Sequence, residues 1–284
     1  MLTSTLATVL ILLSALLHAV VNAHVKTSDD GLLTRGCMNA TAFLVALPFL
    51  AFVPAPTPQL WPLLIAATLV HGLYPFFLVA AYRHGDLSAV LPLARGVAPL
   101  GVAVLAGTLV GEHVTPLQIT SVVMISCGVA MLAFERNVLA SVSGRRGVAL
   151  AIATGLIIAC YTALDAAGLR AAATPLSYIA WLFVFDGLFV SSLVVCVRRA
   201  AVIPFVRSNW RSALLGGGLG VATYGLALYA LSLGTMVEIA ALRETSVIFA
   251  AIIGALVLHE PFGKRRVLAA CVVAAGVILM QASQ

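Results

Sequence analysis

Two arginines lie inside apolar stretches of this chain, and their side chains are the ones best suited to bind a ligand. Arg95 begins the sequence R-G-V-A-P and Arg243 begins R-E-T-S-V, with mostly apolar residues on both sides. A guanidinium keeps its charge and presents a planar fork of N–H donors that matches a carboxylate or a phosphonate. Burying it in an apolar span is costly without a partner or water, so we expect both arginines to line an aqueous cavity.

A second set of polar residues shares the apolar stretches and widens the choice of chemistry. Histidine exchanges a proton near neutral pH, and a carboxylate within an apolar span requires a partner or water. Besides the two arginines, the candidates for substrate binding are His18, Asn22, His71, Tyr74, Tyr161 and Tyr224. The candidates for proton coupling or ion pairing are Asp165, Asp186 and Glu244.

Several of these residues also have a purely structural interpretation. His18 and Asn22 could hydrogen-bond to a neighbouring helix, as polar residues in membrane bundles often do. Asp165 could cap the end of its helix, Tyr224 could belong to the core, and Arg95 could serve only to hold backbone carbonyls. The sequence has no set of residues at metal-ligand spacing and no nucleophile–base motif, so we expect no catalytic residue, no metal and no cofactor.

Local sequence predicts how three of the stretches are built. Pro92 and Pro99 bracket Arg95, a pattern that predicts a helix interrupted in mid-span. Arg243 and Glu244 are adjacent, and adjacent residues on a helix diverge by about 100 degrees. We therefore expect one of them to face the cavity and the other to face a neighbouring helix. In a third stretch, Tyr178 and Trp181 suggest an aromatic belt at the membrane surface. In the first stretch, a spacing of four predicts a polar stripe along one helix, made of Ser14, His18, Asn22 and Lys26.

The composition indicates that the surroundings are lipid. Of the 284 residues 62% are hydrophobic and 9% are charged, and the mean hydropathy is +1.11, whereas about a quarter of the residues in soluble domains are charged. Apolar runs long enough to cross a hydrocarbon core of about 30 Å recur almost without a pause. We expect an all-α membrane protein with ten transmembrane helices, at about 3–25, 33–52, 60–82, 87–110, 116–134, 147–169, 176–197, 210–232, 236–258 and 265–281.

An internal repeat organises these helices. Three pairs of residues share one offset of 148 positions: Arg95 with Arg243, Glu112 with Glu260, and Gly128 with Gly276. Two copies of a unit with five helices must enter the membrane in opposite directions, which is the inverted-repeat plan of many secondary transporters. We expect a first repeat at 1–135, a linker at 136–146 and a second repeat at 147–284, arranged around a central cavity.

The net charge of +6 bears on orientation rather than on nucleic acid, for which we expect no binding. Of the 16 Lys and Arg residues, 13 lie in or beside the odd-numbered loops, one lies in an even-numbered loop and two are Arg95 and Arg243. Cytoplasmic loops carry the excess of Lys and Arg. The odd-numbered loops are therefore expected in the cytoplasm and both termini outside.

The two copies carry motifs that resemble a known family. Each copy ends its fourth helix with an apolar run, a Glu and a short turn, G-E-H-V-T-P at 111–116 and H-E-P-F-G at 259–263, before a final helix with a glycine. Together with the stretches at 16–26, 161–170 and 242–246, the whole chain resembles the EamA family of the drug/metabolite transporter superfamily, and a bacterial subgroup in particular. That subgroup often has Trp where this chain has Val21.

The resemblance implies a fold, a place and an activity. It implies ten helices around a central cavity lined by helices 1, 3, 4, 6, 8 and 9, in a bacterial cytoplasmic membrane, with movement of small metabolites without ATP. It also implies cytoplasmic termini, which conflicts with the charge of the loops, and the loop charge is our guide because it acts directly on insertion.

The functional hypothesis is a monomeric secondary transporter or permease that exports a small polar metabolite, either an amino-acid-like zwitterion or a small organic anion. Proton coupling is a further hypothesis. The alternatives are an uptake permease for a phosphonate-like anion and an intramembrane enzyme acting on a lipid-linked phosphate. A repeat of this kind is what alternating access requires, which favours transport.

Overall fold

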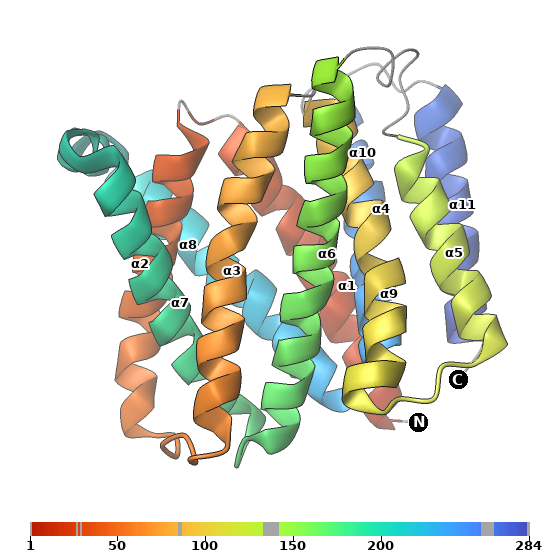
Figure 1. Ribbon diagram of the computed structural model, residues 1–284, viewed down its shortest axis with the longest axis horizontal. Coiled ribbons are helices and arrows are strands. Elements are labelled where there is room, and N and C mark those ends of the chain that lie inside the picture. The colour runs from red at the N-terminus through yellow and green to blue at the C-terminus, as the bar shows by residue number, and fades with distance from the viewer. Residues whose placement is uncertain are drawn as a thin grey trace.

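The chain folds into a bundle of helices that run along one common direction (Figure 1). The computed structural model describes residues 2–26, 28, 30–84, 87–132, 142–256 and 264–282, and no strand occurs among them. The helices are α1 (Leu2–Lys26), α2 (Gly31–Ala46), η1 (Leu47–Ala51), α3 (Leu60–His84), α4 (Leu87–Leu105), η2 (Ala106–Val110), α5 (Pro116–Ala130), α6 (Val142–Ala171), α7 (Pro175–Arg198), η4 (Arg199–Ala201), α8 (Val202–Leu233), α9 (Met236–Arg243), α10 (Ser246–Leu256) and α11 (Lys264–Gln281).

The outer surface of the bundle is apolar. Six stretches of helix in the described part of the chain are long and apolar enough to cross a membrane, and α5 and α11 contain shorter apolar helices. Large apolar side chains such as Val104, Leu215 and Ile278 are exposed by two thirds or more of their surface. Exposed apolar surface of this extent marks contact with lipid or with another protein. The prediction of an all-helical membrane protein is confirmed.

The predicted interruption of the fourth span is wrong, because α4 runs without a break through Pro92 and Pro99. A proline removes only its own N–H bond, and a membrane helix tolerates this loss when its neighbours compensate for it. The break lies instead in the ninth predicted span, where α9 ends at Arg243 and α10 begins at Ser246.

Short-range hydrogen bonds at residues 244 and 245 make this break without any proline. The N–H of Glu244 bonds to the carbonyl of Ala241 at 3.1 Å, and the N–H of Thr245 bonds to that of Leu242 at 3.1 Å. The Thr245 hydroxyl also donates to the Leu242 carbonyl at 2.7 Å. Bonds to the third residue back tighten the last turn of a helix, so α9 ends here and α10 starts afresh.

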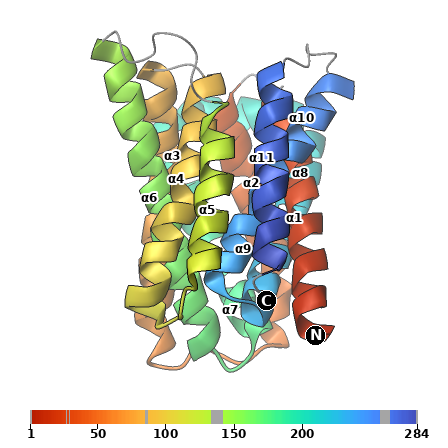
Figure 2. The ribbon, with the colours of Figure 1, turned by 90° about the vertical axis from the view of Figure 1, so that its right-hand side faces the viewer.

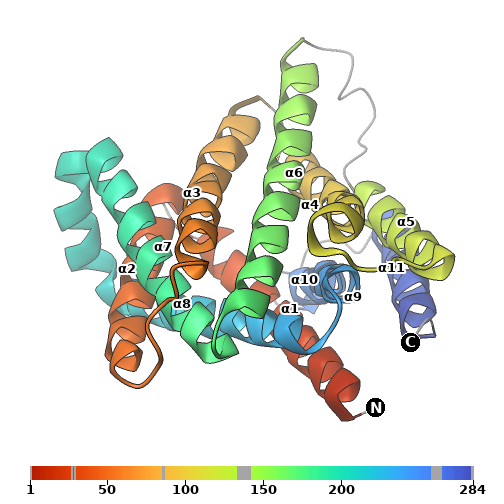
Figure 3. The same ribbon diagram turned by 60° about the horizontal axis from the view of Figure 1, so that its bottom comes forward.

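The helices of the two predicted repeats pack in corresponding ways. Helix α3 packs on α6 as α8 packs on α1, and α4 packs on α6 as α9 and α10 pack on α1. Two pairs, α5 with α11 and α2 with α7, join a helix to its own counterpart and lie at opposite ends of the bundle (Figure 3). This is the packing that two equivalent halves would produce, although the repeat boundaries remain a prediction. Of the linker predicted at 136–146, residues 136–141 lie outside the described residues.

Two glycines at the predicted offset bring α5 and α11 together. A Cβ added to Gly128 on α5 would lie 2.8 Å from Val273 Cγ2, and one added to Gly276 on α11 would lie 2.6 Å from Ile125 Cγ1. Each helix thus presents a glycine to a branched side chain of the other. Small residues allow this close approach of helices in membranes.

Most basic residues gather at one end of the bundle. Figure 2 shows both termini at the other end. The helix ends opposite the termini carry Arg83 on α3, Arg145 and Arg146 on α6, Arg198 on α7 and Lys264 on α11. An ion pair between Arg198 and Asp30, 3.0 Å long, also lies at this end.

Candidate functional site: a pocket between α4, α6, α8 and α9

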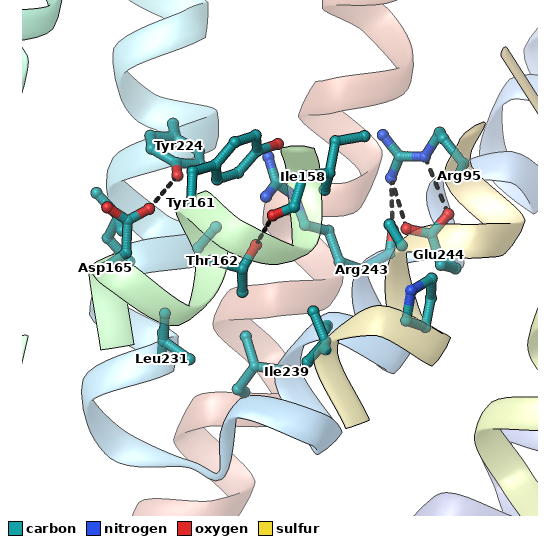
Figure 4. Close-up of a pocket in the computed structure, with 16 residues that line it drawn as sticks. Arg95, Ile158, Tyr161, Thr162, Asp165, Tyr224, Leu231, Ile239, Arg243 and Glu244 are labelled. Carbon is teal, nitrogen blue, oxygen red and sulfur yellow. Dashed lines mark hydrogen bonds and ion pairs between the residues drawn. The ribbon is translucent and has the colours of Figure 1, made fainter. Parts of the chain in front are cut away.

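A pocket lies between helices α4, α6, α8 and α9 in the interior of the bundle (Figure 4). Its empty space is about 560 Å³ when the part that opens to the outside is included. Its polar lining consists of Arg95, Tyr161, Thr162, Asp165, Tyr224, Arg243 and Glu244. The rest of the wall is apolar, with Val102, Leu231 and Ile239 among its residues. A few convergent polar groups in an apolar wall are typical of small-molecule sites.

The guanidinium of Arg95 is fully engaged by protein groups. Its Nε donates to Glu244 Oε2 at 2.9 Å and its Nη2 donates to Glu244 Oε1 at 3.2 Å, which is a two-point ion pair. Nη2 also donates to Ser246 Oγ at 3.1 Å, and Nη1 donates to His18 Nε2 at 2.8 Å. The side chain therefore ties α4 to the α9–α10 break and to α1, and its charge is balanced by Glu244.

Both Arg243 and Glu244 line this pocket, contrary to the prediction that only one of the two would do so. The prediction assumed a continuous helix, on which neighbours point about 100 degrees apart. Because α9 ends at Arg243, Glu244 lies in the connecting turn and reaches Arg95 across the pocket wall. The helix break is thus what brings the three charged groups together.

The guanidinium of Arg243 is placed quite differently from that of Arg95. It lies over the ring of Tyr224, with its central carbon 5.0 Å from the ring centroid. Its Nε is buried and has no hydrogen-bond partner, and within the described part of the chain it forms no ion pair. A cation–π contact holds the charge in place without neutralising it. Arg243 therefore keeps donors for an anion that enters the pocket.

One wall of the pocket continues into a cluster of polar groups. The Tyr224 hydroxyl donates to Asp165 Oδ2 at 2.5 Å (Figure 4), and the Tyr178 hydroxyl donates to Asp165 Oδ1 at 2.8 Å. Behind them His71 on α3 hydrogen-bonds through Nδ1 to Asp186 on α7. Both carboxylates thus have partners in the bundle, and Asp165 does not act as a helix cap.

Glu112, one of the residues of the predicted repeat, holds the end of the bundle on the side of the termini. Both of its carboxylate oxygens accept the N–H of Met236 at 3.0 Å, at the first residue of α9. It also pairs with Arg170 at the end of α6. A carboxylate at the start of a helix satisfies its free N–H groups and its dipole. The corresponding Glu260 lies outside the described residues.

The second half of the sequence matches a known family. Residues 145–281 match the sequence model described as the EamA-like transporter family. This part of the chain is similar to the EamA-like transporters. These residues cover α6 to α11, and therefore Tyr161, Asp165, Tyr224 and Arg243 of the pocket.

A solved structure resembles this chain along its whole length. A chain described as "Crystal structure of protein" is 18% identical, covers 99% of both chains and has a TM-score of 0.78. At this identity the likeness shows the fold alone. No curated protein matches the sequence.

The structure gathers most of the predicted site residues, though not at equal depth. Arg95, Tyr161, Tyr224, Arg243, Asp165 and Glu244 line the pocket. His18 touches Arg95 and His71 touches Tyr224 from behind the lining, and Asp186 lies one step farther out, against His71. Tyr74 packs edge-on against Tyr161 and below the guanidinium of Arg35, and Asn22 is half-buried outside the lining.

Thr162 of the pocket lining was not predicted from the sequence, and neither were Tyr178 and Ser246, which hydrogen-bond to lining residues. Tyr178, predicted for a membrane-surface belt, is fully buried and donates to Asp165. Ser246 accepts from Arg95 at the start of α10. Tyr178 carried no signal, because aromatic residues near a helix end are common at membrane surfaces. The polar run of residues 243–246 did carry one for Ser246, since four polar residues in an apolar span require partners.

Proposed function

We propose that this chain is a secondary transporter for a small organic anion or an amino-acid-like zwitterion, and that Arg243 binds the acidic group of the substrate. The observation that supports this most is the contrast between the two arginines of the pocket. Arg95 is neutralised by Glu244 at two points, whereas Arg243 rests on Tyr224 with a buried Nε that lacks a partner. A partly buried cation that forms no ion pair in the described part of the chain favours binding of an anion.

Asp165 offers a second contact on the opposite side of Tyr224. It lines the same pocket as Arg243, and the tyrosine touches both. A zwitterion could place its carboxylate at Arg243 and its ammonium toward Asp165. The apolar residues Leu231 and Ile239 form the wall beside them and suit a small side chain.

The break between α9 and α10 supports transport over simple binding. Interrupted helices near the middle of the membrane mark the substrate sites of many secondary transporters, where two repeats move against each other. Here the break carries Arg243 at one side and Ser246 at the other. We propose that two inverted repeats, at 1–135 and 147–284, alternate around this pocket in a monomer, in the cytoplasmic membrane of a bacterium with the basic end of the bundle in the cytoplasm.

A flux screen tests the proposal. Lipid vesicles that contain the purified protein would be loaded with one unlabelled amino acid or small organic acid at a time. Counterflow, the uptake of the same compound in labelled form, would then be measured without ATP. We expect counterflow for at least one acid with wild-type protein and with Arg83→Gln, an exposed arginine at the end of α3. We expect Arg243→Gln to abolish it and Arg243→Lys to retain part of it. Equal flux in Arg243→Gln would refute the role of Arg243, and silence of the wild-type protein toward every compound would refute the substrate class.

A further inference from the structure

A histidine between two carboxylates stands directly behind the pocket wall. His71 Nδ1 bonds to Asp186 Oδ2, while His71 Nε2 lies 3.4 Å from Asp165 Oδ2 and 3.2 Å from the Tyr224 hydroxyl. The Tyr224 hydrogen already points to Asp165, so its oxygen accepts from Nε2. With an acceptor at each ring nitrogen, both nitrogens carry hydrogen and the ring is an imidazolium.

The three charged groups of this cluster are buried and do not balance. The side chains of His71, Asp165 and Asp186 are exposed by 9%, 1% and 13%. Two carboxylates and one imidazolium leave one negative charge in the interior. Asp186 Oδ1 and Thr68 Oγ1 are both buried, and the two side chains are neighbours without forming a well-aligned hydrogen bond. A buried carboxylate oxygen without a well-aligned donor is the natural place for a proton.

Tyr224 connects this cluster to Arg243. Its ring centroid lies 5.6 Å from that of His71, and the Arg243 guanidinium lies 5.0 Å from it on the pocket side. The other titratable groups that face the cluster are Tyr161 on α6, whose ring centroid is 4.4 Å from that of His71, and Tyr178 on α7. Both are neutral phenols at physiological pH.

A count of charge shows how substrate and proton depend on each other. Among the charged groups of the pocket lining and the cluster, Arg95 and Glu244 cancel, and the positive charge of Arg243 faces the single negative charge of the cluster, so these groups sum to zero. Binding of a monoanion at Arg243 makes this set of groups negative by one. A proton on Asp186 restores neutrality, and charges in a medium of low dielectric interact strongly over such distances. Each binding event therefore favours the other.

We propose that the His71–Asp165–Asp186 cluster is a proton-binding site that couples the transporter to protons, with one proton bound on Asp186 for each monoanion bound at Arg243. The proton comes from water on one side of the membrane, binds Asp186 Oδ1 and returns to water on the other side, and no other bond changes. A zwitterion leaves the charge count unchanged and moves without this proton. The proposal rests on the role given to Arg243 above.

Infrared difference spectroscopy tests the proton site without any substrate. Purified protein in lipid nanodiscs is titrated with acid while the carbonyl stretch of a protonated carboxylic acid is followed. We expect this band in the wild-type protein and in Asp30→Asn, which makes the same change at the α2 cap near the basic end. We expect its loss in Asp186→Asn and a displaced frequency in Asp186→Glu, which keeps the acid even if the amide variant folds poorly.

The coupling has its own variant. Arg243→Gln removes the same positive charge that a bound anion neutralises, so it should move the midpoint of the Asp186 band to higher pH, whereas Arg83→Gln should leave it in place. A band that survives in Asp186→Asn, or that disappears only in Asp165→Asn, would overturn the assignment to Asp186. A midpoint that is the same in Arg243→Gln would overturn the coupling. Counterflow that depends on Arg243, without an Asp186 band, would contradict the proton site alone. An Asp186 band in a protein that shows no counterflow would contradict the transport proposal alone.

Discussion

Removing the charge of Glu244 is the perturbation that the structure predicts most sharply. The change Glu244→Gln keeps the size of the side chain and leaves Arg95 as a buried cation without a counter-ion. The two side chains are exposed by only 11% and 6%, and the pair is closed at two points. Because both side chains are almost fully buried, the folded state should be strongly destabilised.

The size of the effect follows from burial. Breaking a buried ion pair by removing one partner costs about 3–5 kcal/mol. Arg95 keeps His18 and Ser246 as partners, which places the expected loss near the lower value, about 3 kcal/mol. In a chain of this size about 1 kcal/mol shifts the unfolding midpoint by roughly 2–4 °C, so Tm should fall on the order of 10 °C.

Thermal unfolding of purified protein in detergent measures this loss. The matched control is Arg198→Gln, which breaks the Asp30 pair, because side chains exposed by 41% and 28% contribute at most about 1 kcal/mol. The double variant Arg95→Met with Glu244→Gln should recover part of the lost stability, since it removes the unpaired cation. A fall in Tm no larger than that of the control would refute the interpretation of Arg95 and Glu244 as a closed pair.

Three further predictions concern a glycine contact, a hydroxyl contact and the orientation of the chain in the membrane. Gly128→Ala should lower the free energy of unfolding by about 1–3 kcal/mol, because the added Cβ meets the side chain and backbone of Val273. The added Cβ of Gly218→Ala meets nothing within 4 Å, so this control variant should be tolerated. Comparison of the Tm values of the two variants tests the prediction. Tyr224→Phe removes the hydroxyl bound to Asp165 and should lower Tm by about 5 °C for a loss of about 1.5–3 kcal/mol, with Tyr229→Phe on the same helix as control; equal shifts would contradict the bond. A reporter enzyme that works only outside the cytoplasm should be active when it is fused to Gln284. Activity of a reporter that works only in the cytoplasm would reverse the predicted orientation.

The sequence predicts the pocket in outline because a charged side chain within an apolar span must face the interior of the bundle or a cavity rather than lipid. Arg95 and Arg243 are identified by their positions inside apolar stretches and by their shared offset of 148, and both line the pocket. Their unequal roles are also written in the sequence. The position after Arg243 is Glu244, whereas the corresponding position after Arg95, at the offset of 148, is Gly96. At these corresponding positions the two copies have one carboxylate for two arginines, and the sequence does not specify which arginine Glu244 pairs with, because that depends on the break after Arg243.

The position of the break itself was not predictable from residue types. The first copy carries Pro92 and Pro99, the usual signals of an interrupted helix, and its helix is continuous. The second copy has Ala240 and Val247 at the corresponding positions, and its helix breaks between them. The break is held by tertiary contacts of Glu244 and Ser246 with Arg95, and such contacts override local preference.

Binding of the transported acid by two variants tests the central claim most directly. Calorimetric titration with the acid identified by counterflow should give a Kd for Arg243→Gln that is at least about 30-fold higher than for wild-type protein, because a buried charged contact is worth about 2 kcal/mol or more. Glu112→Gln, at the end of the bundle and outside the pocket lining, should bind within a few-fold of wild type. Unchanged affinity in Arg243→Gln would contradict the assignment of Arg243 as the anion-binding residue.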